Sequence, residues 1–322
     1  MKNNIFLLIA ASIFILSFSS CDDLLDVTPK DKITPETFFS TEADLQAFST
    51  NFYNSLPKDR DLYKDDADNI THSTPNSAAT DSRTVPASGG GWEWGYLRRF
   101  NTLLQYSVNC KDKTVRTRYQ ALTRFFRAYF YFELVKRYGG VPLVGDNVYV
   151  LGDDVQLPRN TFAQCIDYIV RELDEIKDDL RSLPMADATE FAHAPTKEAC
   201  LAMKARVLLY AASPLFNEKP LEAGNELIGY PSYDSGRWNL AAQAAKDLID
   251  QYGPKGKGTL NLAQDYRNIF VDFYGGNNPE LIFFRPVGKN KSIETANGPL
   301  GFSGNSLGNG NTNPTQNLVE SF

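Results

Sequence analysis

The chain contains few of the residues that enzymes and metalloproteins use for chemistry. Its 322 residues include 2 histidines, His72 and His193, whose separation fits no metal-ligand spacing. Apart from Cys21, the cysteines Cys110, Cys165 and Cys200 lack the paired spacing of a zinc site or a disulfide framework. We expect these three to be buried in helices as small apolar side chains. No Gly-x-Ser-x-Gly nucleophile motif occurs. The sequence therefore predicts no metal site, no cofactor and no enzymatic activity.

Basic clusters are also missing. The chain has 33 Lys and Arg against 39 Asp and Glu, which gives a formal net charge of -6. A mildly acidic chain without a basic patch is a poor partner for nucleic acid, so we expect no nucleic-acid binding. Beyond the N-terminus no apolar run is long enough to span a bilayer, and no further membrane span is predicted.

The N-terminus has the pattern of a lipoprotein signal peptide. Lys2 precedes an apolar segment from Ile5 to Phe18, which ends at Ser19, Ser20 and Cys21. The segment is too short to span a bilayer comfortably, and small residues precede the cysteine. We predict cleavage of residues 1–20 and lipidation of Cys21, so that the mature protein is tethered to a membrane by its acyl chains. An uncleaved N-terminal anchor is the alternative.

Helical periodicity dominates the rest of the chain. Thr41 with Asp44 and Thr161 with Gln164 have the spacing of capping boxes, which mark helix starts. Further helices are predicted over 94–108 and 114–138, from Thr196 and over 238–252. The best strand candidate is 281–284. The prediction is a mainly all-α fold of stacked, tetratricopeptide-like helix pairs with little strand and no fixed repeat period. Long irregular loops at 57–91 and 275–314 interrupt the helices.

Several segments resemble the SusD/RagB family of outer-membrane nutrient-binding lipoproteins. They are CDDLLDVTPKDKITPETFFSTEADLQAF (21–48), RFFRAYFYFELVKRYGGVPLV (124–144), LPRNTFAQCIDYIVRELDEIKDDL (157–180), PTKEACLAMKARVLLYAASP (195–214) and PTQNLVESF (314–322). They occur in the family's order and cover essentially the whole chain. The resemblance implies tetratricopeptide-like helix pairs, a shallow sugar-binding face built from loops, a position over a TonB-dependent (SusC-like) transporter, and no catalysis.

The resemblance also implies a division of the chain. Residues 1–20 would be the signal peptide, 21–40 the lipidated tether, 41–274 the helical-repeat domain and 275–322 the loop-rich start of the family's C-terminal section. Because 314–322 resembles the point where that section begins, we expect part of it to be missing from this sequence. Asp22 and Asp23, directly after Cys21, resemble the surface-export signal of Bacteroidetes lipoproteins. They imply an outer-membrane protein that faces the cell exterior.

The candidate ligand site lies where the first long loop runs into a helix. Trp92, Trp94 and Tyr96 follow a glycine run, and the same loop contains Asp81 and Arg83. Pyranose rings present apolar C–H faces that stack on aromatic rings, and their hydroxyls need charged or amide partners. We therefore predict that these five residues bind an oligosaccharide or polysaccharide. For Trp94 a packing role in the following helix is equally compatible with the pattern.

Two other aromatic groups receive different interpretations. Tyr230 and Tyr233 form a weaker second candidate site, whereas Trp238 falls on an apolar stripe and is predicted to be core. The aromatic residues of 124–138 surround the helix axis, which is typical of a buried helix.

The leading hypothesis is a surface lipoprotein that captures oligosaccharides and hands them to a TonB-dependent outer-membrane transporter. One alternative is a protein that only bridges or lids such a transporter during uptake of peptides or other nutrients. Another is a lipid-anchored glycoside hydrolase, because paired carboxylates can be close in space without any sequence signature.

Overall fold

The computed structural model describes residues 38–57, 70–72, 92–183, 194–256, 260–271, 278–285 and 312–322, with the single positions 82, 84, 258, 291, 295 and 298. The chain divides into two units, 1–38 and 39–322, and every helix and strand described below belongs to the second. The predicted signal peptide and tether, including Cys21, lie outside the described residues. In the part of the chain that is described, no helix is both long and apolar enough to cross a membrane.

The first described helix begins at the predicted capping box. Helix α3 covers Glu42–Ser49 and continues as the 3-10 helix η2, Thr50–Ser55. The Thr41 hydroxyl accepts from the Asp44 amide at 3.2 Å, and the Asp44 carboxylate accepts from the Thr41 amide at 2.8 Å. These two bonds satisfy backbone donors that the first helical turn leaves unpaired.

A pair of helices follows. Helix α5 covers Gly95–Tyr106, the 3-10 helix η3 covers Ser107–Asn109, and α6 covers Lys113–Tyr138. Helix α6 ends at Gly139, whose φ of +71° is a left-handed conformation that favours glycine. A Cβ at Gly139 would also lie 2.2 Å from the carbonyl oxygen of Leu227, so there is no room for a side chain at this end of helix α6.

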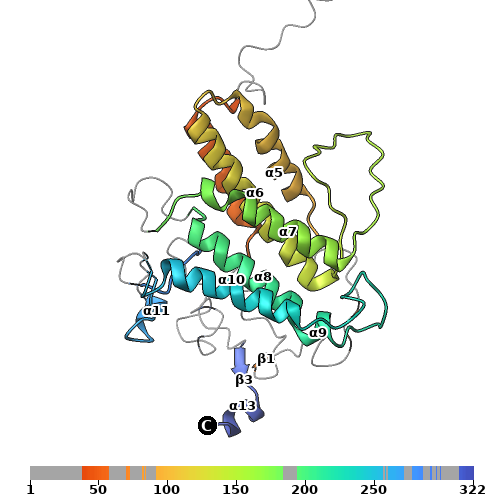
Figure 1. Ribbon diagram of the computed structural model, residues 1–322, viewed down its shortest axis with the longest axis vertical. Helices are drawn as coiled ribbons and strands as arrows, with labels where there is room; N and C mark the ends of the chain where they lie inside the picture. Colours follow the sequence, from red (N-terminus) through yellow and green to blue (C-terminus); the bar gives the residue numbers. More distant parts are fainter. Residues whose placement is uncertain are drawn as a thin grey trace, which may run out of the picture. The chain divides into compact units, whose positions relative to one another are not determined.

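The remaining helices extend the stack. They are α7 (Phe162–Ile176), the 3-10 helix η4 (Lys177–Asp179), α8 (Lys197–Ala212), α9 (Pro214–Asn217) and α10 (Gly236–Tyr252). Helix α6 packs on α5 and α7, α7 packs on α8, and α8 packs on α10 (Figure 1). Successive helices thus pack on one another along the sequence, as in a helical repeat array. The predicted mainly α-helical class is confirmed.

Aromatic rings fill the space between the first helices. Phe52 of η2 lies 4.9 Å from Phe100 of α5 and 5.8 Å from Phe126 of α6, measured between ring centroids. Phe125, Phe126, Tyr131 and Phe132 are all buried. The prediction that the aromatic residues of α6 form core rather than a ligand site is confirmed for these residues.

The predicted strand at 281–284 is wrong. This segment has no regular structure, and Phe283 instead inserts its ring 5.3 Å from that of Phe125. A short apolar run of four residues does not distinguish a strand from a loop whose side chains pack against a helical core. Short strands occur elsewhere: β1, Ile70–His72, pairs antiparallel with β3, Thr312–Pro314. The short helices α11 (Asn268–Val271) and α13 (Gln316–Glu320) complete the described elements.

Helix α10 corrects a second expectation. Trp238 was predicted to be core, but its side chain is 39% exposed. Helix α10 meets α8 through a narrow face on which Ala241 and Ala244 are buried, and Trp238 lies in the first turn of α10, before this buried part of the face. By contrast, Cys110, Cys165 and Cys200 are free and buried, as predicted.

Candidate functional site

The predicted aromatic site lies beside the start of α5 and the end of α6. Trp92 is 41% exposed, and its ring lies 4.9 Å from that of Trp94 and 4.8 Å from that of Tyr138, between centroids. The interplanar angles are 82° and 73°, so both contacts are edge-to-face. Each such contact contributes about 0.5–1.5 kcal/mol beyond area burial. An exposed indole is therefore held in a defined orientation by two half-buried rings.

The local backbone explains why these rings come together. Trp94 is the N-cap of α5, and its carbonyl oxygen accepts from the Arg98 amide at 3.3 Å. The Tyr96 amide donates to the Glu93 carbonyl at 3.2 Å, so the chain turns over Glu93–Tyr96, where the helix begins. Trp92 directly precedes this turn, and its ring contacts those of Trp94 and of Tyr138, the C-terminal residue of α6.

Tyr96 has a different role from the two tryptophans. Its hydroxyl donates to the backbone carbonyl of Asn54 at 3.0 Å, and its ring lies 5.8 Å from that of Phe130. Burial and the nearby Glu93 carboxylate raise the pKa of Tyr96, whereas the charge of Arg99 opposes the shift. Tyr96 therefore joins α5 to the end of η2, and its hydroxyl already has a protein partner.

The other predicted site residues fall into two groups. Asp81 and Arg83 lie outside the described residues. In the weaker second site, the Tyr230 ring packs edge-to-face on Phe162 at 5.2 Å, and the Arg237 guanidinium lies 3.6 Å from its centroid. Tyr230 is thus engaged in packing, and Tyr233 is the exposed member of that pair.

A polar groove that the sequence analysis missed lies between α5, α6 and α7. Its volume is about 830 Å³, and its wall contains an ion network centred on buried Glu172 and Arg127. Glu172 accepts from Arg124 Nη2 at 2.9 Å and from Arg127 Nη2 at 2.8 Å. Arg127 also donates to Asp146 at 2.6 Å, and Arg124 pairs with Glu175. The visible sequence signal was the i, i+3 spacing of two arginines on α6 and of two glutamates on α7.

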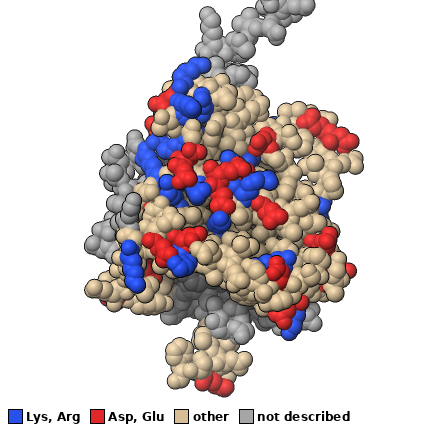
Figure 2. Space-filling view, viewed as in Figure 1, with Lys and Arg blue, Asp and Glu red and all other residues tan. Residues whose placement is uncertain are grey.

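The chemistry of this network is set by mutual pairing. Burial acts to raise the pKa of Glu172, but the hydrogen bonds from Arg124 and the charge of Arg127 outweigh it and hold that pKa below its ordinary value. Glu172 is therefore a stable carboxylate. Acidic and basic side chains also intermingle on the face seen in Figure 2. Elsewhere in the fold, the ion pair of Lys204 on α8 with Asp174 on α7, at 2.7 Å, joins neighbouring helices. The ion network therefore holds these helices in position and does not provide a reactive side chain.

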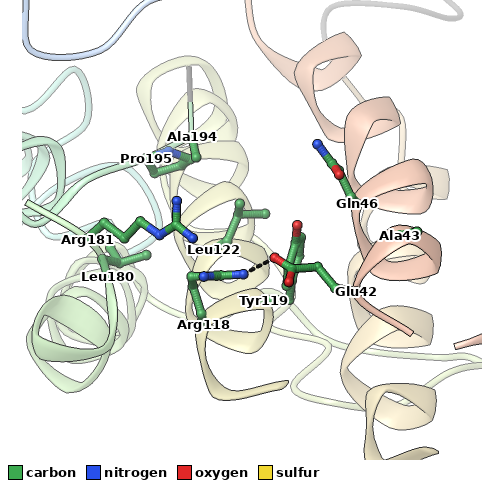
Figure 3. A pocket seen from close by; sticks show the side chains of 10 residues that line it. All are labelled: Glu42, Ala43, Gln46, Arg118, Tyr119, Leu122, Leu180, Arg181, Ala194 and Pro195. Atoms are coloured by element: carbon green, nitrogen blue, oxygen red, sulfur yellow. Dashed lines mark hydrogen bonds and ion pairs between the residues drawn. The ribbon is translucent and has the colours of Figure 1, made fainter. Parts of the chain in front are cut away.

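A smaller pocket of about 240 Å³ lies between α3, α6 and the segments at Arg181 and Pro195 (Figure 3). The carboxylate of Glu42 forms an ion pair with the guanidinium of Arg118, and the Arg118 guanidinium lies 5.4 Å from the Tyr119 ring centroid. Burial raises the pKa of Tyr119. This pocket has no nucleophile paired with a base. Within the described ranges, no group of His, Cys, Asp and Glu could hold a metal ion.

These features define a class of protein first: an α-helical repeat protein with a fixed, exposed aromatic site beside its helices. The family follows from the sequence. Residues 23–209, more than half of the chain, match the SusD-like family described as starch-binding and associating with the outer membrane. The chain belongs to this family, and its resemblance to SusD-like proteins is thereby confirmed.

Curated and solved relatives agree with this assignment. A SusD-like protein of Formosa agariphila is 26% identical over an alignment of 204 residues that covers 60% of this chain and 39% of the relative. A SusD-like protein of Bacteroides fragilis has the same fold, with a TM-score of 0.66, 24% identity, and coverage of 91% of this chain and 55% of that one. A laminarin-binding SusD-like protein gives a TM-score of 0.56 at 15% identity, covering 74% of this chain and 50% of the other. The chain thus spans about half the length of these relatives.

Proposed function

We propose that the protein is a surface glycan-binding lipoprotein that captures oligosaccharides and passes them to a TonB-dependent outer-membrane transporter. The observation that supports this function most directly is the Trp92 indole, 41% exposed and held between Trp94 and Tyr138. Membership in a family described as starch-binding adds to it.

The physical argument begins with the ring. An exposed indole offers an apolar face on which a pyranose can stack, and its two edge-to-face contacts reduce the entropy that binding would otherwise cost. Sugar hydroxyls require partners, and exposed Glu93 beside the ring can accept hydrogen bonds from them. Asp81 and Arg83, on the preceding loop, are proposed to add contacts of the same kind. Trp94 and Tyr138 position the indole, and Tyr96 anchors the helix behind it.

The N-terminal residues are the basis for the proposed cellular location. A signal peptide at 1–20, lipidation of Cys21 and the acidic pair Asp22 and Asp23 would tether the protein to the outer membrane, facing outward. A protein tethered to the outer face of the membrane could bind polysaccharide outside the cell, before its uptake. Residues 41–274 would form the helical-repeat domain and 275–322 the start of the C-terminal section.

We propose binding without catalysis. A glycoside hydrolase needs a carboxylic acid whose pKa is raised so that it can protonate the leaving group. The buried carboxylate of the groove, Glu172, has the opposite shift, because Arg124 and Arg127 stabilise its ionised form. Its arrangement therefore suits a structural ion network.

The test is a glycan array followed by calorimetry on the chain from residue 22, with Trp92→Ala and a matched control, Trp238→Ala. The two tryptophans are 41% and 39% exposed, so the variants remove similar amounts of exposed aromatic surface from different places. We expect Trp92→Ala to weaken binding to one glycan class by at least about tenfold and Trp238→Ala to leave it unchanged. Equal binding by Trp92→Ala and the unmodified protein would refute the site. Silence of the folded protein across the array would favour a transporter lid for a nutrient other than a glycan.

A further inference from the structure

We propose that the loop between α6 and α7 is a protein-docking element whose tip, Val150 and Leu151, inserts into an apolar pocket with a basic rim on the transporter. The inference relies on the proposed function for the identity of the partner. The loop runs from Pro142 to Thr161 without helix or strand (Figure 1). Irregular segments of this length within a folded domain usually have a function.

The tip of the loop is apolar and exposed. Leu151 is fully exposed, Val150 is exposed beside it, and Val155 and Leu157 are exposed in the part of the loop that leads back to α7. Single exposed apolar residues are ordinary on protein surfaces, but a group of them on one projection indicates an interaction site.

The tip is also locked in one conformation. The Asp153 amide donates to the Val150 carbonyl at 3.2 Å, and the Asp153 carboxylate accepts from the Val150 amide at 2.7 Å. Gly152 has a φ of +100°, which is the conformation of the third residue of a type II turn. Leu151 therefore occupies the corner of a closed turn. A tip that is ordered before binding loses less entropy on binding.

The base of the loop is fixed by buried polar side chains. Asn101 of α5 donates to the carbonyls of Gly145 and Asn147 at 2.9 and 2.8 Å, and Arg127 of α6 donates to the Asp146 carboxylate at 2.6 Å. Asn101 and Arg127 are both buried, whereas Asp146 is exposed. The helices thus hold the loop from inside the fold.

On the far side of the loop, the Asn160 side chain accepts from the Leu143 amide at 3.0 Å. The Arg159 guanidinium donates to the Gly140 carbonyl at 2.7 Å. Both stems are therefore anchored, and the direction of the tip is determined by the core.

Charge selects among the possible partners. Asp146, Asp153 and Asp154 lie on the loop, and no Lys or Arg occurs between Arg137 and Arg159. An acidic tip is repelled by an anionic lipid surface, and a second copy of this chain, with its formal net charge of -6, is a poor match as well. A protein pocket with an apolar floor and a Lys- or Arg-rich rim complements both the aliphatic side chains and the carboxylates.

The experiment uses the full chain in living cells, with the photoreactive residue p-benzoylphenylalanine in place of Leu151. The matched control carries it in place of Leu221, an exposed leucine of a different loop. After irradiation, we expect the first variant to form an adduct with a TonB-dependent transporter, identified by mass spectrometry, and the control to form none. An adduct with a second copy, with lipid alone or with nothing would overturn the inference.

A second measurement separates this inference from the proposed function. Leu151→Ser should reduce transporter co-purification at least about tenfold, while leaving glycan affinity equal to that of the unmodified protein. If no transporter adduct forms at Leu151 but glycan binding depends on Trp92, the docking loop is refuted and the proposed glycan binding is not. A transporter adduct without any glycan binding would refute the glycan part of the proposed function and leave the loop standing.

Discussion

Replacing Glu172 by Gln should destabilise the protein far more than the same change at Glu175. Both carboxylates lie on α7 and both accept from Arg124, but their side chains are 7% and 52% exposed. Glu172 also accepts from buried Arg127 at 2.8 Å. Glutamine keeps one acceptor oxygen but removes the charge and directs an NH₂ group toward a guanidinium.

The magnitude follows from burial. Removing one partner of a buried ion pair costs about 3–5 kcal/mol, because the remaining charge is left without compensation. Arg127 would retain Asp146 at 2.6 Å and Asn101 at 2.9 Å, so we expect the lower end, about 3 kcal/mol. Glu175→Gln removes an exposed partner and should cost about 0–1 kcal/mol. The corresponding fall in melting temperature is about 6–12 °C for Glu172→Gln and at most about 4 °C for the control.

The assay is urea unfolding followed by circular dichroism at 222 nm, repeated from neutral to acidic pH. The pKa of Glu172 is lower in the folded state than its reference value of 4.5. The stabilisation from its ionised form is therefore complete above that value and is lost as the pH falls through the folded-state pKa. Glu172→Gln should lose stability less steeply on acidification than the unmodified protein. Equal destabilisation by the two variants, or parallel acid profiles, would refute the assignment of a buried ion network.

The remaining predictions concern the core and its glycines. Phe130→Ala should cost about 3–5 kcal/mol in urea unfolding, because the ring is buried. Gly140→Ala should prevent stable folding, judged by soluble yield and melting temperature, because its Cβ would lie 2.0 Å from a backbone oxygen. Gly145→Ala, where φ is +65° and the space is open, should cost only about 1 kcal/mol. Burial raises the pKa of Cys200 to about 12, so its thiol should not react with Ellman's reagent at pH 8 until the protein is unfolded.

The elements that could be predicted from sequence are those with local signals. The helix starts at Thr41 and Thr161 followed from capping boxes, in which donor and acceptor lie three residues apart. The end of α6 followed from a glycine whose left-handed conformation stops a helix. The exposure of Trp92 is consistent with its place in a polar, glycine-rich loop before a helix.

The elements that could not be predicted depend on contacts between distant parts of the chain. Trp238 lies on a regular apolar stripe, and periodicity alone cannot tell which part of a stripe meets a neighbouring helix. Phe283 packs against the core from a segment 158 residues away from its partner Phe125. The hydrogen bonds from Asn101 to Gly145 and Asn147 link residues 44 and 46 positions apart, and no local pattern indicates them.

The hydrogen bonds and ion pairs of Arg127 are better explained as a means of fixing the position of the Leu151 loop than as a source of folding stability. Well-packed apolar residues often replace a buried ion network without loss of stability, so such a network is weak evidence for a stabilising role. Here the arrangement is not even complete, because Arg127 Nε and the Tyr168 hydroxyl are buried without a partner among the described residues. What apolar residues could not reproduce is the set of directed bonds from Arg127 and Asn101 to residues 145–147. These bonds connect α5, α6 and α7 to the base of the Leu151 loop, and a docking element needs that fixed direction.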